Sequence, residues 1–329
     1  MVRPASPTVN PPAPLARNEG MDLDAALIRH ARVNRSAVER RTATLGGRRT
    51  VKKAWQAAWL LKAVTLIDLT TLAGDDTPDR VRRLCAKAGR PVRPDILAAL
   101  GADDLGITTA AVCVYHEMVP AAVAALEGTD IPVAAVSTGF PAGLSPFRLR
   151  VEEIRESVAA GAREIDIVIS RRHVLTGDWQ ALHDELCTFR EACGPAHMKA
   201  ILATGELGTL TNVRRASLVA MMAGADFIKT STGKERVNAT LPVSLVMMRA
   251  IRDYAALTGF KVGFKPAGGI STAKDALAWL ILLREELGRR WMEPDLFRFG
   301  ASSLLADIER QLEHAATGRY SAFWRHPAA

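Results

Sequence analysis

Short apolar runs and amphipathic stretches alternate along most of the chain after residue 63. The apolar runs are rich in β-branched residues and predict strands near residues 64–69, 110–114, 132–137, 164–169, 197–203, 225–230, 260–265 and 296–300. Helical periodicity follows them near residues 78–88, 117–127, 148–160, 179–192, 210–223, 241–257, 272–288 and 302–315. Eight strand–helix units in about 265 residues favour an α/β fold, the closed (β/α)8 TIM barrel.

A doubly wound parallel sheet is the structural alternative to the barrel. Such a sheet is expected to carry a glycine-rich dinucleotide-binding turn after an early strand. The sequence has no such turn. The pattern therefore favours the barrel.

The first 63 residues lack this alternation and predict an N-terminal extension. Residues 1–20 contain five prolines and little apolar content, so we expect this leader to be disordered. Residues 22–41 and 51–63 predict helices, and the second is amphipathic, with Trp55 and Trp59 packed on the body. The predicted division is a leader (1–20), a helical extension (21–63), the barrel (64–318) and a C-terminal tail (319–329).

Composition narrows the class of protein. Hydrophobic residues make up 48% of the chain and charged residues 24%, as in globular proteins. The longest apolar run, residues 276–283, is far shorter than the ~20 residues that cross a bilayer. The four cysteines are scattered, without a C-x-x-C pair or a nearby histidine cluster, so we expect neither disulfides nor a metal site. A cytoplasmic setting fits best.

The net charge of +8 raises the question of nucleic-acid binding. Residues 1–53 hold eleven Lys/Arg and four Asp/Glu, which leaves 32 basic and 31 acidic residues for the rest. The basic character thus belongs to the extension, where few aromatic residues interleave as stacking platforms. We expect no nucleic-acid or membrane partner. A basic arm that binds one of them is the alternative.

Charged residues at predicted strand ends carry the candidate chemistry, because barrel enzymes place their active sites at the C-terminal ends of the strands. The polar strand-end positions are Asp68, Cys113, Asp166, Lys199, Lys229 and Lys265. Lys229 and Lys265 end neighbouring predicted strands, which lie ~4.8 Å apart. Two ammonium groups this close repel, so one should lose its proton and become nucleophilic toward a carbonyl. The alternative is that the lysines simply reach solvent.

Glycine- or hydroxyl-rich turns follow the last three predicted strands. They are residues 231–234 (STGK), 267–269 (AGG) and 300–303 (GASS). Loops after strands seven and eight, together with a helix N-terminus, form a recurrent phosphate site in barrels. The three turns together predict phosphate binding, whereas each alone could be ordinary turn chemistry.

Several motifs resemble those of the deoxyribose-phosphate aldolase family. They are residues 67–72 (IDLTTL), 203–207 (ATGEL), 226–234 (DFIKTSTGK), 262–269 (VGFKPAGG) and 299–305 (FGASSLL). The leader segment 51–61 (VKKAWQAAWLL) resembles the long, eukaryotic-type branch. The resemblance covers about residues 50–318.

The resemblance implies a class I aldolase of deoxyribose phosphate catabolism, without a metal or cofactor. It would reversibly cleave 2-deoxy-D-ribose 5-phosphate into D-glyceraldehyde 3-phosphate and acetaldehyde, and a homo-oligomer is possible. It implies Lys229 as the Schiff-base lysine, Lys265 as the lysine that lowers its pKa, and Asp166 as the proton-shuttling acid. The implied phosphate-binding residues are Gly233, Lys234, Gly268, Gly269, Gly300, Ser302 and Ser303, and the supporting residues are Asp68, Cys113, Lys199 and Thr204.

A barrel that only binds a phosphorylated ligand is the alternative from another functional class. Such a binding protein would have no need of a lysine with a lowered pKa.

Overall fold

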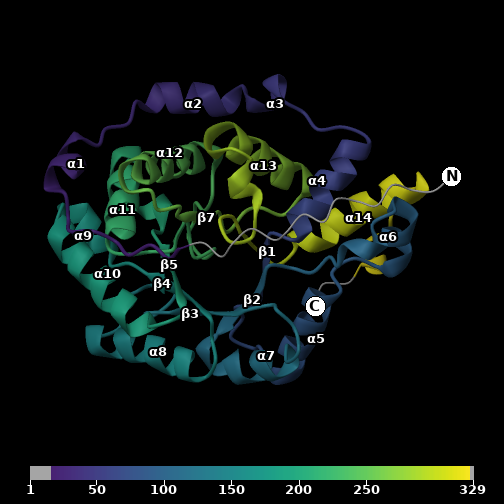
Figure 1. The fold of residues 1–329 in the computed structure, drawn as a ribbon, viewed down its shortest axis with the longest axis horizontal. Helices are drawn as coiled ribbons and strands as arrows, with labels where there is room; N and C mark the ends of the chain where they lie inside the picture. Colours follow the sequence, from purple (N-terminus) through teal and green to yellow (C-terminus); the bar gives the residue numbers. More distant parts are fainter. Residues whose placement is uncertain (1–15, 327–329) are drawn as a thin grey trace.

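Eight parallel strands form the centre of the molecule in a computed structural model that describes residues 16–326 (Figure 1). The strands are β1 (Ile67–Thr70), β2 (Ala111–Tyr115), β3 (Val133–Ser137), β4 (Glu164–Val168), β5 (His197–Ile201), β6 (Phe227–Lys229), β7 (Gly263–Lys265) and β8 (Phe299–Ala301). Consecutive strands pair, β1 pairs with β8, and isolated bridges join β7 to the β8 segment at Phe264–Phe297 and Ala267–Gly300. The predicted (β/α)8 barrel is confirmed.

A ring of helices encloses the strands (Figure 1). From the first strand onward these helices are α5 (Pro78–Gly89), α6 (Pro94–Leu100), α7 (Val119–Ala125), α8 (Phe147–Ala159), α9 (Arg171–Thr176), α10 (Trp179–Cys193), α11 (Leu210–Met222), α12 (Leu241–Thr258), α13 (Ala273–Leu287) and α14 (Leu304–Thr317). Eight of them match the predicted helices to within a few residues. The short helices α6 and α9 were not predicted.

Local sequence signals fix where the helices begin. Thr77 accepts a hydrogen bond from the backbone of Arg80 and is followed by proline at the first helical position. Thr272 and Asp275 form a reciprocal capping box at the start of α13. These two caps set where the turns after β1 and β7 end and the helices α5 and α13 begin. The turns therefore have defined positions at the mouth of the barrel.

The N-terminal extension forms four helices on the outside of the ring: α1 (Ala25–His30), α2 (Arg35–Ala43), α3 (Leu45–Arg48) and α4 (Ala54–Val64). The expected single helix over 22–41 is wrong, because the chain is extended at Ala31 and Asn34, and Asn34 caps a new helix. The extension packs α1 on α11, α2 on α12, and α4 on α13 and α14.

Residues at the start of the described chain are ordered against the barrel. Asn18 is buried, and its amide donates to the carbonyls of Met221 (2.7 Å) and Ala225 (2.9 Å). The hydroxyl of Tyr254 donates to the Asn18 side-chain oxygen (3.0 Å). The expectation of a disordered leader over 1–20 is therefore wrong for residues 16–20, because buried polar partners hold them. Residues 1–15 lie outside the described residues.

No helix in the described part of the chain is both long enough and apolar enough to cross a bilayer.

Candidate active site

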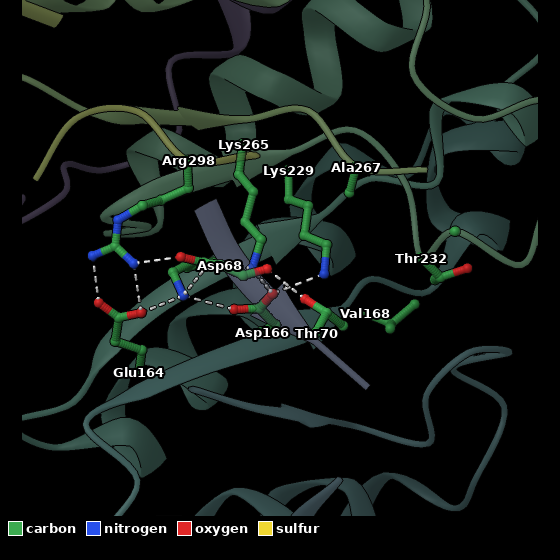
Figure 2. A network of polar contacts seen from close by, with 12 residues as sticks. Asp68, Thr70, Glu164, Asp166, Val168, Lys229, Thr232, Lys265, Ala267 and Arg298 are labelled. Atoms are coloured by element: carbon green, nitrogen blue, oxygen red, sulfur yellow. Dashed lines mark hydrogen bonds and ion pairs between the residues drawn. The ribbon is translucent and has the colours of Figure 1, made fainter. Parts of the chain in front are cut away.

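A closed network of charged side chains fills the inside of the barrel (Figure 2). Each member is at most 5% exposed. The members are Asp68 from β1, Glu164 and Asp166 from β4, Lys199 from β5, Lys229 from β6, Lys265 from β7 and Arg298 just before β8. Burying this many charges is costly unless each one is paired. The pattern of ion pairs therefore determines which of these groups stay charged.

Strand register explains why these residues meet. Asp166 pairs with Lys199 across β4 and β5, and Lys229 pairs with Lys265 across β6 and β7. Glu164 lies two residues before Asp166, and side chains two apart on a strand point to the same face. Both carboxylates therefore point into the barrel.

Lys229, Lys265 and Asp166 meet within the network, and the side chains of the two lysines extend side by side toward Asp166 (Figure 2). The Asp166 Oδ2 atom lies 2.7 Å from Lys229 Nζ and 2.7 Å from Lys265 Nζ. The Phe140 ring covers the same region, with its centroid 6.0 Å from Lys229 Nζ. The lysine amines thus share one carboxylate oxygen in a desolvated space.

A second group of contacts holds these three residues in place. Lys199 Nζ lies 2.6 Å from Glu164 and 3.0 Å from Asp166, and Lys265 Nζ lies 2.5 Å from Asp68. Arg298 donates to Asp68 (2.6 Å) and to Glu164 (2.8 Å). Every carboxylate in the network therefore contacts at least two cationic groups.

The charges in the network balance only if one base is neutral. Four basic groups (Lys199, Lys229, Lys265, Arg298) face three carboxylates (Asp68, Glu164, Asp166). Lys229 has one carboxylate contact, whereas each of the other three bases has at least two. Lys229 is therefore the base that can give up its proton at the smallest loss of pairing.

The pKa shifts of the lysines and of Asp166 agree with this charge balance. Burial lowers the pKa of Lys229 and the charge of Lys265 lowers it further, which together outweigh the opposing effect of Asp166. Burial also acts to lower the pKa of Lys265, but Asp166 and Asp68 outweigh it and the pKa of Lys265 is raised. Asp166 has a pKa well below its ordinary value, because the three lysines outweigh its burial. Of the two lysines at Asp166, Lys229 is therefore the one whose pKa is shifted toward the neutral amine and Lys265 the one whose pKa is shifted toward the ammonium.

The predicted strand-end positions are only partly right. Lys229 and Lys265 do end their strands. Asp68, Asp166 and Lys199 instead lie inside strands that continue for two further residues. Their side chains therefore sit deeper in the barrel than expected, and Lys199 supports Asp166 from within.

Cys113 also lies inside its strand, in contact with a small apolar cluster that includes Ala134 and Val136. Burial raises the pKa of its thiol, which disfavours the reactive thiolate. Its geometry fits a packed thiol.

Sequence reasoning missed Glu164 and Arg298. Arg298 stands between two phenylalanines that are both fully buried, and this was the available signal. A charged residue inside such a run requires a buried partner. Its partner Glu164 lies 134 positions away, so no local pattern could identify it.

The three glycine- or hydroxyl-rich turns meet at the mouth. Thr230 joins the first two, since its hydroxyl accepts from the backbone N–H of Ala267 (3.0 Å). A Cβ on Gly233 would lie 3.9 Å from the Gly268 backbone, and one on Gly300 would lie 3.2 Å from the Lys265 side chain. At position 233 the positive φ of 87° favours glycine, and at position 300 the absence of a Cβ leaves space next to Ala267 and the Lys265 side chain.

Some hydrogen-bond donors of these turns already have a partner in the protein, and others do not. The N–H of Gly233 donates to Glu235 (3.2 Å), and Lys234 Nζ donates to the Leu72 carbonyl (3.2 Å). Within residues 16–326, no protein acceptor is found for the backbone N–H groups of Gly268, Gly269, Ser302 and Ser303. Ser302 and Ser303 directly precede the N-terminus of α14, where the helix dipole favours an anion.

Thr204 opens a short 3-10 helix (Thr204–Glu206) after β5. Its backbone N–H donates to the Thr230 carbonyl (2.9 Å), while its buried hydroxyl has no partner among the described residues. Thr204 therefore joins the loops after β5 and β6. Across the described residues, no group of three or more His, Cys, Asp or Glu is arranged to hold a metal ion.

The fold and this site define an α/β-barrel enzyme with a lysine in position for imine chemistry, and known proteins of this kind match the chain. A family model described as DeoC/LacD family aldolase matches residues 62–310. The deoxyribose-phosphate aldolases of Mus musculus and Homo sapiens are 64% and 63% identical to the chain over 310 residues. Each match covers 94% of this chain and 98% of the relative.

A solved structure, the tetrameric deoxyribose phosphate aldolase from Aeropyrum pernix, has the same fold. Its TM-score is 0.58 at 20% sequence identity, and the match covers 80% of this chain and 98% of that chain. The chain therefore belongs to the DeoC/LacD family of aldolases.

Proposed function

We propose that this enzyme reversibly cleaves 2-deoxy-D-ribose 5-phosphate into D-glyceraldehyde 3-phosphate and acetaldehyde, with Lys229 as the imine-forming residue. The observation that carries the proposal is the Lys229 amine, buried beside Asp166 and Lys265 in a network whose charges balance when this amine is neutral. The identity to two mammalian deoxyribose-phosphate aldolases supports the choice of substrate.

Imine formation begins with the neutral Lys229 amine. Its nitrogen attacks the C1 aldehyde of the open-chain sugar, and loss of water from the carbinolamine leaves a protonated imine. Asp166 and Lys265 are placed to exchange protons in the steps that follow imine formation, because Asp166 Oδ2 lies 2.7 Å from both lysine nitrogens. Lys265 keeps its charge because of its contacts with Asp166 and Asp68.

Carbon–carbon cleavage follows from the imine. The protonated imine withdraws electrons from C2, so the C2–C3 bond breaks as the C3 hydroxyl loses its proton. Glyceraldehyde 3-phosphate leaves, and the electron pair of the broken bond remains as an enamine on Lys229. Protonation at C2 and addition of water then release acetaldehyde and the free amine. The Asp166–Lys265 pair supplies and removes these protons in the proposal.

We assign the phosphate group to the turns after β6, β7 and β8, around Gly233, Lys234, Gly268 and Gly269. The unpaired N–H groups at Gly268 and Gly269, and at Ser302 and Ser303 before α14, support this assignment. Gly300 leaves the space between this region and Lys265. The sugar then reaches from the phosphate turns to Lys229.

A direct test follows both products over time with deoxyribose 5-phosphate as the substrate. We expect acetaldehyde and glyceraldehyde 3-phosphate in equal amounts from the native chain and none above background from Lys229→Ala. Lys261→Gln, an exposed lysine away from the site, is the matched control and should keep full activity. Product formation by Lys229→Ala at the native rate would rule out the proposed mechanism.

Setting and assembly form a further part of the proposal. Cytoplasmic residence fits the four cysteines, which are all free. A homo-oligomer fits a family in which the Aeropyrum pernix protein is tetrameric. Size-exclusion chromatography with light scattering measures the molar mass and so the number of subunits.

A further inference from the structure

A cavity lies on the outer side of the barrel, and none of the residues that line it belongs to the lysine network. It has a volume of about 980 Å³ and is enclosed by α4 with the residues before it, by α13 and by the short 3-10 helix Arg289–Met292. Helix α4 runs beside α13 and α14 in this part of the molecule (Figure 1). The volume is at the upper end of the range for small-molecule sites, about 300–1,000 Å³. The proposed aldolase mechanism does not use this cavity.

The wall of this outer cavity is strongly basic. Five basic residues (Arg49, Lys52, Lys62, Arg284, Arg289) and two acidic residues (Glu285, Glu293) line it, a net charge of +3. Both acidic residues are already paired. Glu293 pairs with Lys62 (2.6 Å), and Glu285 accepts from three arginines, of which Arg49 lies 3.3 Å away.

The remaining cations are free of carboxylates. None of the described carboxylates pairs with Lys52, Arg284 or Arg289. Concentrated unpaired positive charge attracts anions, and arginine binds phosphate with two parallel hydrogen bonds.

Two tryptophans of α4, Trp55 and Trp59, line the same cavity, and they differ in whether the ring is covered. The Trp59 ring is covered by Arg284, whose guanidinium carbon lies 5.6 Å from the ring centroid. Trp55 is 73% exposed, although the sequence pattern predicted that it packs on the body. By contrast, Trp279 and Trp291 are largely enclosed and donate their indole N–H groups within the protein. Trp55 therefore presents a free aromatic face beside unpaired cations.

We propose that this outer cavity binds a nucleoside phosphate, with the base stacked on Trp55 and the phosphates held by Lys52 and Arg289. Positive charge alone would fit any anion, but only a ligand with both an aromatic ring and phosphates uses the indole and the cations together. The ligand class is distinct from the sugar phosphate of the barrel mouth, which lacks an aromatic ring.

Calorimetric titration of the full chain with ATP tests the proposal, with tripolyphosphate and adenosine as partial ligands. We expect saturable binding of ATP, and weaker binding of each partial ligand. Trp55→Ala should weaken ATP binding about tenfold or more while leaving tripolyphosphate binding nearly unchanged. Lys52→Gln combined with Arg289→Gln should weaken both.

Matched controls exist elsewhere on the surface. Trp324→Ala removes another exposed tryptophan, and Lys261→Gln removes an exposed lysine; neither should alter ATP binding. All five substituted residues are exposed, so the fold should survive, which circular dichroism checks.

Several results would overturn the proposal. They are the absence of saturable ATP binding, equal binding by native and cavity variants, and displacement of ATP by deoxyribose 5-phosphate, which would place ATP in the barrel. Much tighter binding of a single-stranded oligonucleotide through the same residues would replace it with a nucleic-acid surface. A change of oligomeric state in Trp55→Ala would instead identify Trp55 as an interface residue.

Discussion

Lys229 is 3% exposed, and its amine contacts a single carboxylate, that of Asp166. A lysine in water has a pKa of ~10.4, so at neutral pH only about one amine in 2,500 is unprotonated. Desolvation and the neighbouring Lys265 both shift the equilibrium toward the neutral form. The side chain that the reaction needs as a nucleophile is thus the one whose protonation the network supports least.

Replacing Lys265 with leucine should raise the pKa of Lys229. The variant leaves three basic groups against three carboxylates, so the network then balances with Lys229 charged. Turnover requires the neutral amine, so the rising limb of the pH–rate profile should move to higher pH, with a severe loss of activity at pH 7. Residual activity measured across pH decides the point, and an unshifted limb would contradict the electrostatic role of Lys265.

Asp166→Asn should separate imine formation from turnover. Removing this negative charge leaves Lys229 neutral, so imine formation in a stopped-flow experiment should stay near the native rate. Proton transfer loses its acid–base group, and turnover should fall by about 10²–10⁴-fold. An equal loss in both rates would instead mean that Asp166 mainly orients Lys229.

At the scale of elements, short strands decide which side chains meet. β6 and β7 have three residues each, and their register places Lys229 opposite Lys265 at the barrel mouth. β4 presents Glu164 and Asp166 on the same face, one below the other. Glu164 holds Lys199 and Arg298, which in turn hold Asp166 and Asp68.

Glu164→Gln should therefore destabilise the whole barrel. The substitution leaves Arg298 and Lys199 short of a buried counter-charge, and losing one partner of such a pair costs about 3–5 kcal/mol. Urea unfolding measures the free energy. The matched control is Glu152→Gln on α8, a half-exposed carboxylate paired with Arg155, for which a change within about 0.5 kcal/mol is expected. Equal values for the two variants would contradict the structural role of Glu164.

The elements were predictable because their signals are local. Apolar runs and helical periodicity located all eight strands and the eight long helices that follow them. The break between α1 and α2 was missed because the capping residue Asn34 lies within a continuous helical pattern. The depth of Asp166 and Lys199 was missed because strand pairing, rather than composition, decides where each strand ends. The Glu164–Arg298 pair depends on barrel closure, which joins residues distant in sequence.

For the whole molecule, the extension is part of the folded body. Arg17 donates to the Ala196 carbonyl (2.7 Å) and pairs with Asp226 (3.2 Å), which adds to the buried contacts of Asn18. Composition alone indicated a solvated leader, because the contacts that order residues 16–20 are supplied by α11, α12 and the β5 region. A polar residue can be ordered when buried backbone groups require it.

Asn18→Ala should lower the free energy of unfolding by about 1–3 kcal/mol, because the Ala225 carbonyl loses its donor and the Met221 carbonyl is left with the Gly224 N–H. Tyr254→Phe is the matched control: it removes only the hydroxyl that donates to Asn18 and should cost about 1 kcal/mol. Thermal or urea unfolding measures both. Native stability in Asn18→Ala would show that residues 16–20 do not contribute to the fold.

The central claim is that the Lys229 amine forms the imine, and reductive trapping tests it most directly. Treating the native chain with acetaldehyde and borohydride should convert the imine into a stable N-ethyl lysine, which peptide mass mapping locates. We predict the label at Lys229 and no label in Lys229→Ala, while Lys261→Gln is labelled like the native chain. A label at Lys265, or equal labelling of the Lys229→Ala chain, would contradict the account.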